Sequence, residues 1–371
     1  MAHGKGAGRR VATLKEVARL AGVHPSTISR ALRNDPNLRI SEGTRRRILQ
    51  AIEATNYHPN RVARSLKAQR THLLGLMVPD IANPFFAVML RGVEDVAGAW
   101  GFHVIVCNTD ERPEKAEAYL QILMGRQIDG MLIATSHRED PIVQRLWREG
   151  YAIVLVNRLC ELAPVPSVSL DEVAGMRLAV EHLLALGHRH IAHIAGPPQV
   201  STAHQRRRTF EEVLHRYGLL RPEWVVQGDY NRQAGYQAMK QLLQLPELPT
   251  ALVAANDLAA LGAISAAREH GLQVPVDLSV VGYNDIPLAA EVSPALTTVR
   301  VPMSQMGARA AELLIARITG GAGQGCVAER VVLQPELVVR ESTAPPTPRQ
   351  RGLAVGRGRG HGHRPAHARL S

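Results

Sequence analysis

The stretch LKEVARLAGVHPSTISRALRN, residues 14–34, decides the fold of the N-terminal part of this chain. Apolar residues recur at helical spacing in its first half. Gly22 stands where that helix must end, because glycine adopts the positive φ of a tight turn without strain. Pro25 suits the first position of a second helix, where a backbone N–H would have no partner within the helix. The stretch therefore predicts two short helices joined by a turn.

The outer face of the second helix is short, polar and basic. Beside Pro25 it carries His24, Ser26, Thr27, Ser29, Arg30 and Arg33. This set fits a DNA-binding helix-turn-helix, whose second helix lies in the major groove. An ordinary helical hairpin of a globular domain would show the same apolar stripes, so this stretch alone leaves both interpretations open.

The positive charge of the chain is concentrated at its ends. The 371 residues carry a net charge of +11, made up of +11 in residues 1–70, −5 in residues 71–340 and +5 in residues 341–371. Neutralising DNA phosphates requires local positive charge, so a basic head on an acidic body favours nucleic-acid binding by the head. A hydrophobic content of 45% with 21% charged residues is typical of a globular chain of this length with two or three domains.

Several functional classes find no support in the sequence. Cys107, Cys160 and Cys326 are widely spaced, which indicates neither a disulfide framework nor a zinc site. The histidines at 188, 190 and 193 are interpreted as structural rather than as metal ligands, because a strand places them on opposite faces. No catalytic motif, export signal or apolar run of about 20 residues is present. We therefore expect a cytoplasmic protein that is not an enzyme, with no catalytic residue, metal or cofactor and no membrane partner.

Two further segments complete the head. Residues 1–10 are expected to form a disordered basic arm, and residues 11–57 to form the helix-turn-helix domain with a third helix that Ser41 or Thr44 caps. Residues 58–70 predict a hinge helix too short to be stable alone in water. In the hinge, Asn60, Arg61, Leu66 and Lys67 are candidate DNA contacts. Leu66 is the candidate wedge for the minor groove, and a plain linker is the alternative.

The body of the chain alternates apolar strands with helices. The run at residues 73–79 is typical of a parallel strand that is buried on both faces. Further strands are expected at 103–107, 131–134, 152–156, 190–194, 224–227, 251–254 and 278–283. This alternation predicts doubly wound parallel sheets. Because about nine strands exceed the usual single sheet, we expect two lobes with a boundary near residues 157–172.

Residues 12–69 resemble the N-terminal region of LacI/GalR-family bacterial repressors. The matching pieces are TLKEVARLAGV, STISRAL and NYHPNRVARSL. The resemblance implies a homodimer on a pseudo-palindromic operator, with base readers at Pro25, Ser26 and Arg30 and a minor-groove wedge at Leu66. Pro25 departs from the polar or aromatic residue of some members. It can offer a base only apolar contact, which leaves the operator sequence open.

The body also resembles the LacI/GalR core, which is similar to periplasmic sugar-binding proteins. The matching stretches include VPDIANPFF, LGHRHIAHIAGP and DLSVVGYNDIPLAAEVSPALTTVRVP. The resemblance implies a two-lobed core over residues 71–342 that the chain crosses three times. The first lobe would hold about 71–170 plus part of 298–329, and the second about 171–297 plus 330–342. Residues 343–371 are expected to form a disordered basic tail.

Polar side chains that follow the apolar strands are the candidates for a ligand site, because ligands of open α/β sheets bind beyond the carboxyl ends of the strands. They are Asn83, Phe85, Asn157, Arg158, Arg206, Asp229, Tyr230, Asn256, Asp257, Asn284 and Asp285. The resemblance places the family's effector contacts on Asn157, Arg206, Tyr230, Asn256 and Asn284. Family members often carry Asp where this chain has Asn157 and Asn284. Amides, Arg206 and few aromatic rings favour a sugar over a purine.

We therefore expect a cytoplasmic, nucleoid-associated transcriptional regulator, most simply a repressor. Its affinity for double-stranded operator DNA would be modulated allosterically by a small molecule, and a sugar is preferred over a purine or nucleoside. The rival classes are a sugar-binding transport protein, which the helix-turn-helix argues against, and an α/β enzyme, for which a catalytic constellation is missing.

Overall fold

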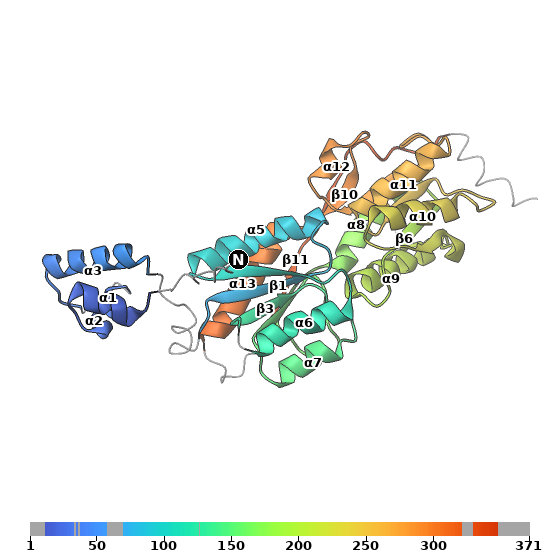
Figure 1. Ribbon diagram of the computed structural model, residues 1–371. Helices are drawn as coiled ribbons and strands as arrows, with labels where there is room; N and C mark the ends of the chain where they lie inside the picture. Colours follow the sequence, from blue (N-terminus) through green and yellow to red (C-terminus); the bar gives the residue numbers. More distant parts are fainter. Residues whose placement is uncertain are drawn as a thin grey trace, which may run out of the picture. The chain divides into compact units, whose positions relative to one another are not determined.

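The computed structural model describes residues 12–32, 35, 38–57, 70–125, 127–320 and 329–347. The chain divides into two compact units, Met1–Thr71 and His72–Ser371. Figure 1 shows the helices of the first unit and the two sheets of the second.

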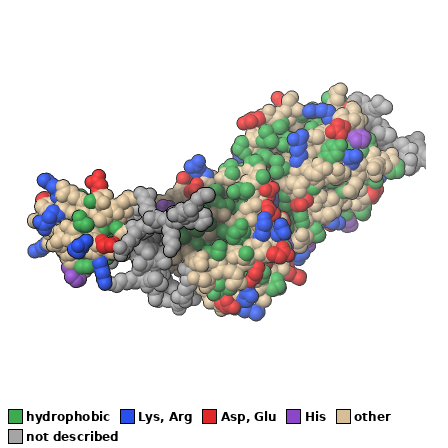
Figure 2. All heavy atoms as spheres, in the orientation of Figure 1, with side chains coloured by type: hydrophobic (Ala, Val, Ile, Leu, Met, Phe, Trp, Pro, Cys, Tyr) green, Lys and Arg blue, Asp and Glu red, His purple; other side chains and the backbone are tan. Residues whose placement is uncertain are grey.

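The described part of the first unit is a bundle of three helices. They are α1 (Leu14–Ala21), α2 (Pro25–Ala31) and α3 (Glu42–Thr55). Its small core is built from Val17, Ala18, Ala21, Ile28, Ile48, Ala51 and Tyr57. Lys and Arg side chains stand out around its surface (Figure 2). The predicted two helices joined by a turn are therefore present, with a third helix packed across them.

Local chemistry explains where the helices of the first unit begin and end. Thr13 and Glu16 form a capping box at the start of α1, with each side chain bonded to the backbone N–H of the other. Gly22 ends α1 at φ 64°, the left-handed conformation that the sequence predicted. Pro25 occupies the first position of α2, and the His24 ring caps that helix. Ser41, rather than Thr44, caps α3.

The second unit contains two six-stranded sheets. In the first sheet, all pairings are parallel and the strand order is β11-β5-β4-β3-β1-β2. Its strands are β1 (Leu73–Val78), β2 (His103–Asn108), β3 (Gly130–Ile133), β4 (Ile153–Val156), β5 (Ser167–Leu170) and β11 (Arg330–Leu333). The second sheet has the order β12-β10-β9-β8-β6-β7, and only β12 runs antiparallel to its neighbour. Its strands are β6 (Ile191–Ala195), β7 (Val225–Gln227), β8 (Ala251–Ala254), β9 (Ser279–Asn284), β10 (Thr297–Arg300) and β12 (Glu336–Val338).

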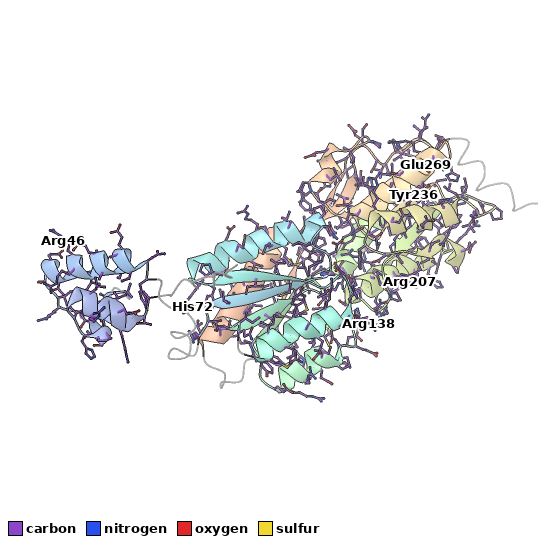
Figure 3. The ribbon with its side chains drawn as sticks, viewed as in Figure 1. Arg46, His72, Arg138, Arg207, Tyr236 and Glu269 are labelled. Carbon is purple, nitrogen blue, oxygen red and sulfur yellow. The ribbon has the colours of Figure 1, made fainter. Side chains whose placement is uncertain are left out.

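Helices cover the faces of both sheets. They are α5 (Pro84–Ala99), α6 (Pro113–Met124), α7 (Pro141–Arg148), α8 (Glu172–Ala185), α9 (Ser201–Arg216), α10 (Arg232–Leu242), α11 (Asp257–Glu269), α12 (Leu288–Glu291) and α13 (Met303–Thr319). In the first lobe, α5 and α13 cover one side of the sheet and α6 and α7 the other (Figure 1). In the second lobe, α10 and α11 pack together, and the Tyr236 hydroxyl donates to Glu269 across them at 2.6 Å (Figure 3). The predicted doubly wound parallel sheets in two lobes are confirmed.

The return of the chain between the lobes differs in part from the prediction. Helix α13 packs on α5 and on the first sheet, as expected for part of 298–329. Residues 330–342 were expected in the second lobe, but β11 pairs with β5 in the first sheet and only β12 joins the second. Strand β5 also lies inside the expected boundary region. These strands contain Ser, Arg or Glu instead of a continuous apolar run, and β11 pairs with a segment remote in the chain, so no local pattern marks them.

The predicted start of the disordered tail, at residue 343, is wrong, because the described structure continues to residue 347. Residues 343–347 are described, and Ala344 donates its N–H to Ser279 Oγ at 3.0 Å. The Thr343 hydroxyl lies 3.0 Å from His182 Nε2. Residues 1–11, most of the hinge and residues 348–371 lie outside the described residues. Within the part that is described, no helix combines the length and apolarity needed to cross a membrane.

Candidate DNA-binding surface and ligand cavity

Helix α2 presents a polar outer face that its buried side holds in place. Ile28 is fully buried against α1 and α3, whereas Ser26 and Arg30 are exposed and Pro25, Thr27 and Ser29 are half-buried. The Ser26 hydroxyl lies 2.8 Å from His24 Nδ1. The face therefore offers a hydroxyl and a guanidinium to solvent from one short rigid helix.

Arg30 is oriented by a carboxylate within the same unit. Its Nε donates to Asp35 Oδ2 at 2.7 Å, and the Arg30 side chain remains 45% exposed. A guanidinium held at Nε still has both terminal nitrogens available for a bidentate contact, such as the one arginine makes with guanine. Sequence reasoning named Arg30 but not Asp35, because the two meet only once α2 ends.

The arginines of α3 have different surroundings. Arg46 projects from the outer face of the helix (Figure 3). Arg47 instead donates from Nε to the Ala21 carbonyl at 3.4 Å and so joins α3 to the end of α1. The predicted contacts Arg33, Asn60, Arg61, Leu66 and Lys67 lie outside the described residues.

A cavity of about 410 Å³ lies between the two lobes of the second unit. Its lining residues are Pro79, Asp80, Asn83, Phe85, Phe86, Asp110, Glu111, Asn157, Arg158, Thr202, Arg206, Asp229, Tyr230, Asn231, Asn256 and Asn284. All six predicted effector residues are among them, namely Phe85, Asn157, Arg206, Tyr230, Asn256 and Asn284. The structure thus brings these side chains together from both lobes.

Two of the broader candidates do not line the cavity. Asp257 is fully buried, where its carboxylate accepts from the Thr298 hydroxyl at 2.5 Å and from the Ile286 N–H at 2.8 Å. Asp285 forms ion pairs with Arg300 and Arg340. Both carboxylates therefore bond to groups within the second lobe and do not line the cavity.

Arg206 is the most constrained side chain of the cavity. It donates from Nε and Nη2 to the two carboxylate oxygens of Glu172, at 2.7 and 3.1 Å, and from Nη1 to the Ala255 carbonyl at 2.8 Å. Its guanidinium carbon lies 3.6 Å from the centre of the Tyr283 ring. Burial alone would lower the pKa of Arg206, but the adjacent Glu172 carboxylate raises it by more. The net shift is upward, so Arg206 stays charged.

Glu172 and Tyr283 hold the Arg206 guanidinium in place, and sequence reasoning named neither as a site residue. The Tyr283 hydroxyl donates to Glu172 Oε2 at 2.8 Å. Gly175 leaves the room for it, because a Cβ atom there would lie 2.1 Å from the Tyr283 hydroxyl oxygen. Burial raises the pKa of Tyr283 well above its usual value, so this phenol remains a donor.

Tyr230 is held at three points. Its hydroxyl lies 2.8 Å from Thr202 Oγ1, its N–H donates to Asp229, and its carbonyl accepts from Asn256 Nδ2 at 2.8 Å. Asn256 also caps α11 through the Ala259 N–H. Asn256, which is 1% exposed, therefore links the Tyr230 backbone to the start of α11.

Two asparagines at the cavity have a backbone reason to be there. Asn157 has φ 67° and Asn284 has φ 118°, values that L-residues other than Asn, Asp and Gly rarely adopt. Asn83 caps α5 by accepting from the Phe85 N–H at 3.1 Å. Phe85 is buried in an edge-to-face contact with Phe86, with 5.0 Å between the ring centres.

The first lobe places a second guanidinium at the cavity. Arg158, only 3% exposed, donates from Nη1 and Nη2 to the two carboxylate oxygens of Glu111, at 3.1 and 2.6 Å. The Arg158 guanidinium also lies 6.0 Å from the centre of the Tyr230 ring in the other lobe. Sequence reasoning included Arg158 among the candidates, but Glu111 lies 47 residues earlier and carried no signal.

The three histidines near β6 have structural surroundings. The His190 ring packs against Trp224, and its Nδ1 lies 3.5 Å from Glu247 Oε1. His188 Nδ1 lies 2.9 Å from Thr250 Oγ1, and its Nε2 lies 2.9 Å from the Ala344 carbonyl. His193 stacks on Phe210 and donates to the Val253 carbonyl at 2.8 Å. In the residues that the structure describes, no group of His, Cys, Asp and Glu is arranged to hold a metal.

Two protein-family models match parts of this chain. Residues 13–60 match the model of bacterial regulatory proteins of the lacI family, and residues 180–343 match the periplasmic binding protein-like domain. The HTH-type transcriptional repressor PurR of Aliivibrio fischeri (strain MJ11) is 36% identical over 336 residues, covering 90% of this chain and 98% of that protein.

The chain belongs to the lacI family of bacterial regulatory proteins. The resemblance to LacI/GalR-family repressors that the sequence predicted is therefore confirmed. Its relatives are DNA-binding transcriptional repressors rather than enzymes.

Solved structures agree with the family assignment. One similar structure is the lac repressor dimer bound to operator and the anti-inducer ONPF. It superposes with a TM-score of 0.79 at 29% identity, and the match covers 90% of this chain and 100% of that one. The complex of the transcriptional regulator CelR with cellobiose gives a TM-score of 0.68 at 33% identity, covering 89% of this chain and 99% of that one. The head of helices and the two-lobed core are therefore the family's architecture.

Proposed function

We propose that this lacI-family repressor binds a sugar in the cavity between its lobes and that the sugar changes its affinity for operator DNA. The observation that carries the proposal is the cavity itself, where amides, carboxylates and guanidinium groups from both lobes surround one ligand-sized space. Such groups match the alternating donors and acceptors of sugar hydroxyls. A ligand that contacts both lobes can favour one lobe arrangement and so shift the DNA-binding equilibrium.

The aromatic side chains favour a sugar over a purine. The Phe85 and Phe86 rings are buried against each other, and Tyr230 is held by its hydroxyl and flanked by Arg158. A flat purine is usually bound between exposed ring faces, whereas a sugar needs one apolar face and many polar partners. The CelR complex with cellobiose supports a sugar, and the likeness to PurR supports a purine or nucleoside as the second candidate.

The first unit supplies the DNA contacts in this proposal. Ser26 and Arg30 would form hydrogen bonds to base edges in the major groove, and Pro25 would give apolar contact. Thr27 and Ser29 lie on the same short helix beside them. The predicted hinge contacts, including Leu66, remain part of the proposal.

A second copy of the chain is the proposed partner, in the cytoplasm at the nucleoid. Apolar side chains gather over α5 and the neighbouring part of the first lobe (Figure 2). Ile81 precedes α5 and Trp100 follows it, and they are 57% and 61% exposed, while Ile105 of the edge strand β2 is 43% exposed. A homodimer would cover these groups and would present two heads to the half-sites of a pseudo-palindromic operator.

The DNA part of the proposal is tested by selecting preferred duplexes from a random pool. The full-length protein should enrich a pseudo-palindromic sequence, and Arg30→Ala should abolish that preference. Arg46→Ala is the matched control, because loss of an outward arginine of α3 should weaken binding to all duplexes alike. An Arg30→Ala protein that still enriches the same sequence would show that α2 does not read the bases.

The ligand part is tested by measuring operator affinity and the thermal unfolding midpoint with sugars and with purines. A sugar should raise the midpoint and change operator affinity, whereas adenine, guanine and their nucleosides should do neither. A response to purines alone would select the second candidate, and a ligand that stabilises the protein without altering operator affinity would contradict the allosteric coupling.

A further inference from the structure

At the ligand cavity, both guanidinium groups are paired with carboxylates, whereas carboxylates outnumber the cations. Each guanidinium that lines the cavity already donates from two nitrogens to one carboxylate. Arg206 donates from Nε and Nη2 to Glu172, and Arg158 donates from Nη1 and Nη2 to Glu111. Such bidentate contacts use the geometry with which arginine otherwise binds a phosphate. The positive charges of the cavity are therefore neutralised before a ligand arrives.

Further carboxylates remain once these pairs are formed. The described lining residues include four carboxylates, Asp80, Asp110, Glu111 and Asp229, against two guanidinium groups. Lys115 pairs with Asp110 from outside the lining. Glu172 compensates Arg206 from outside it as well. This leaves Asp80 and Asp229 uncompensated by any described cation at the cavity, so its charge is negative.

The helix N-termini at the cavity are partly bonded already. Asn83 caps the start of α5, Asn231 the start of α10 and Asn256 the start of α11, so one backbone N–H of each first turn is bonded to a side chain. In α9, Thr202 of the first turn lines the cavity, and the neighbouring Ser201 hydroxyl accepts from the Leu159 N–H at 2.8 Å. A phosphate would have to displace a carboxylate from its arginine and would face two further carboxylates.

We infer that the effector is an uncharged carbohydrate, without a phosphate or carboxylate group, and that Glu111 sets this selectivity by neutralising Arg158. The inference rests on the proposed sugar function and narrows its ligand class. Glu111 is suited to the role because its side chain is 43% exposed while that of Arg158 is 3% exposed. Removing the Glu111 charge therefore changes the exposed member of the pair and leaves Arg158, which lines the cavity, without its carboxylate partner.

The first experiment compares neutral sugars with their phosphate esters on the full-length protein. Glucose is paired with glucose 6-phosphate and ribose with ribose 5-phosphate, cellobiose is added as a neutral disaccharide, and thermal unfolding and calorimetry report binding. At least one neutral sugar should bind, and each phosphate ester should bind at least about tenfold more weakly than its parent sugar. A phosphate ester that binds as tightly as its parent overturns the inference and leaves the proposed sugar function intact. If no sugar of either kind binds, the proposed function fails, and this inference fails with it.

The second experiment separates charge from shape with a matched pair of variants. Glu111→Gln should improve the affinity for the phosphate esters about tenfold or more, since one charge-assisted contact to phosphate becomes available. Glu117→Gln makes the same change of charge at an exposed pair with Arg145, outside the cavity lining, and should leave those affinities unchanged. Equal affinities in the wild type and Glu111→Gln would overturn the assignment of selectivity to Glu111.

Discussion

The side chain of Arg206 shows why a single residue of this cavity cannot be removed without affecting its neighbours. Its guanidinium is bound by Glu172, by a backbone carbonyl and by the face of Tyr283, and both it and Glu172 are nearly fully buried. Deleting the arginine would leave a buried carboxylate without its cation. Loss of a ligand response in such a variant would therefore mix loss of binding with loss of stability.

The stability part can be measured separately. Arg206→Ala should lower the free energy of unfolding by about 3–5 kcal/mol, because Glu172 loses its partner. The double variant Arg206→Ala with Glu172→Gln should be destabilised by much less than the sum of the two single changes, since it leaves no unpaired charge. Denaturant unfolding of all four proteins gives the comparison, and additive losses would show that the pair is not coupled.

At the DNA-binding surface, Asp35 is expected to act through Arg30. Asp35→Asn should reduce the discrimination between the preferred operator and a site with one changed base pair, by up to about tenfold, because Arg30 loses the partner that orients it. Glu42→Gln removes the same charge from an exposed position of the same unit and should change only overall affinity. Competition binding measures both effects, and equal discrimination in the two variants would contradict the role of Asp35.

At the scale of elements, α5 and α13 show how helices hold the first lobe together. The backbones approach so closely that a Cβ atom at Gly92 would lie 1.9 Å from the Ser304 carbonyl oxygen. A Cβ atom at Gly307 would lie 2.0 Å from the Met89 carbonyl oxygen. Because backbone atoms cannot move aside as a side chain can, glycine is required on each helix where the two meet.

Alanine substitutions at two glycines should therefore have opposite effects. Gly307→Ala should destabilise the protein by about 1–3 kcal/mol or more, because the added methyl group forces the two helices apart. Gly98→Ala in α5 meets no atom within 4 Å and should stabilise by up to about 1 kcal/mol through helix propensity. Thermal unfolding compares the two, and equal effects would contradict the close approach.

For the whole molecule, the buried histidines make stability depend on pH. Burial, helped by the Arg206 and Arg207 charges, lowers the pKa of His193 from 6.5 to about 4. Burial also lowers the pKa of His182, His188 and His190. Because the folded pKa of His193 lies below its unfolded value, the unfolded state takes up the proton first as the pH falls. The stability that depends on neutral His193 is full above pH 6.5 and is lost between pH 6.5 and about 4.

His193→Asn should remove this dependence while its amide keeps a donor for the Val253 carbonyl. Between pH 7 and pH 4, the stability of the variant relative to the wild type should rise by about 3 kcal/mol, the free energy that corresponds to the pKa shift. His215→Asn, at an exposed position of α9, is the control and should follow the wild type. Parallel pH profiles for His193→Asn and the wild type would contradict the assignment.

Much of the architecture follows from local patterns. The spacing of Val17, Ala18 and Ala21, the turn glycine and Pro25 together predict the helix-turn-helix, because each acts within a few residues of the chain. The long buried strands are recognisable from continuous apolar runs. The polar residues that follow these strands could be assigned to one ligand site, because the carboxyl ends of parallel strands lie at the same edge of a sheet.

Four strands and the partner residues followed from no such pattern. Strands β5, β10, β11 and β12 each contain Ser, Thr, Arg or Glu instead of a continuous apolar run, and β11 pairs with a strand about 160 residues earlier. Neither Glu172 beside Arg206 nor Glu111 beside Arg158 could be assigned from the sequence, since the members of each pair lie 34 and 47 residues apart.

The helical head, the two-lobed α/β body and the polar residues at the strand ends are encoded locally in the chain, because periodicity, capping and strand direction act over short distances. The pairing of each arginine with its carboxylate, the lobe that receives β11, and the absence of Asp257 and Asp285 from the cavity lining are set by the folded chain. Those outcomes depend on contacts between segments remote in the chain, and such contacts leave no trace in the spacing of neighbouring residues.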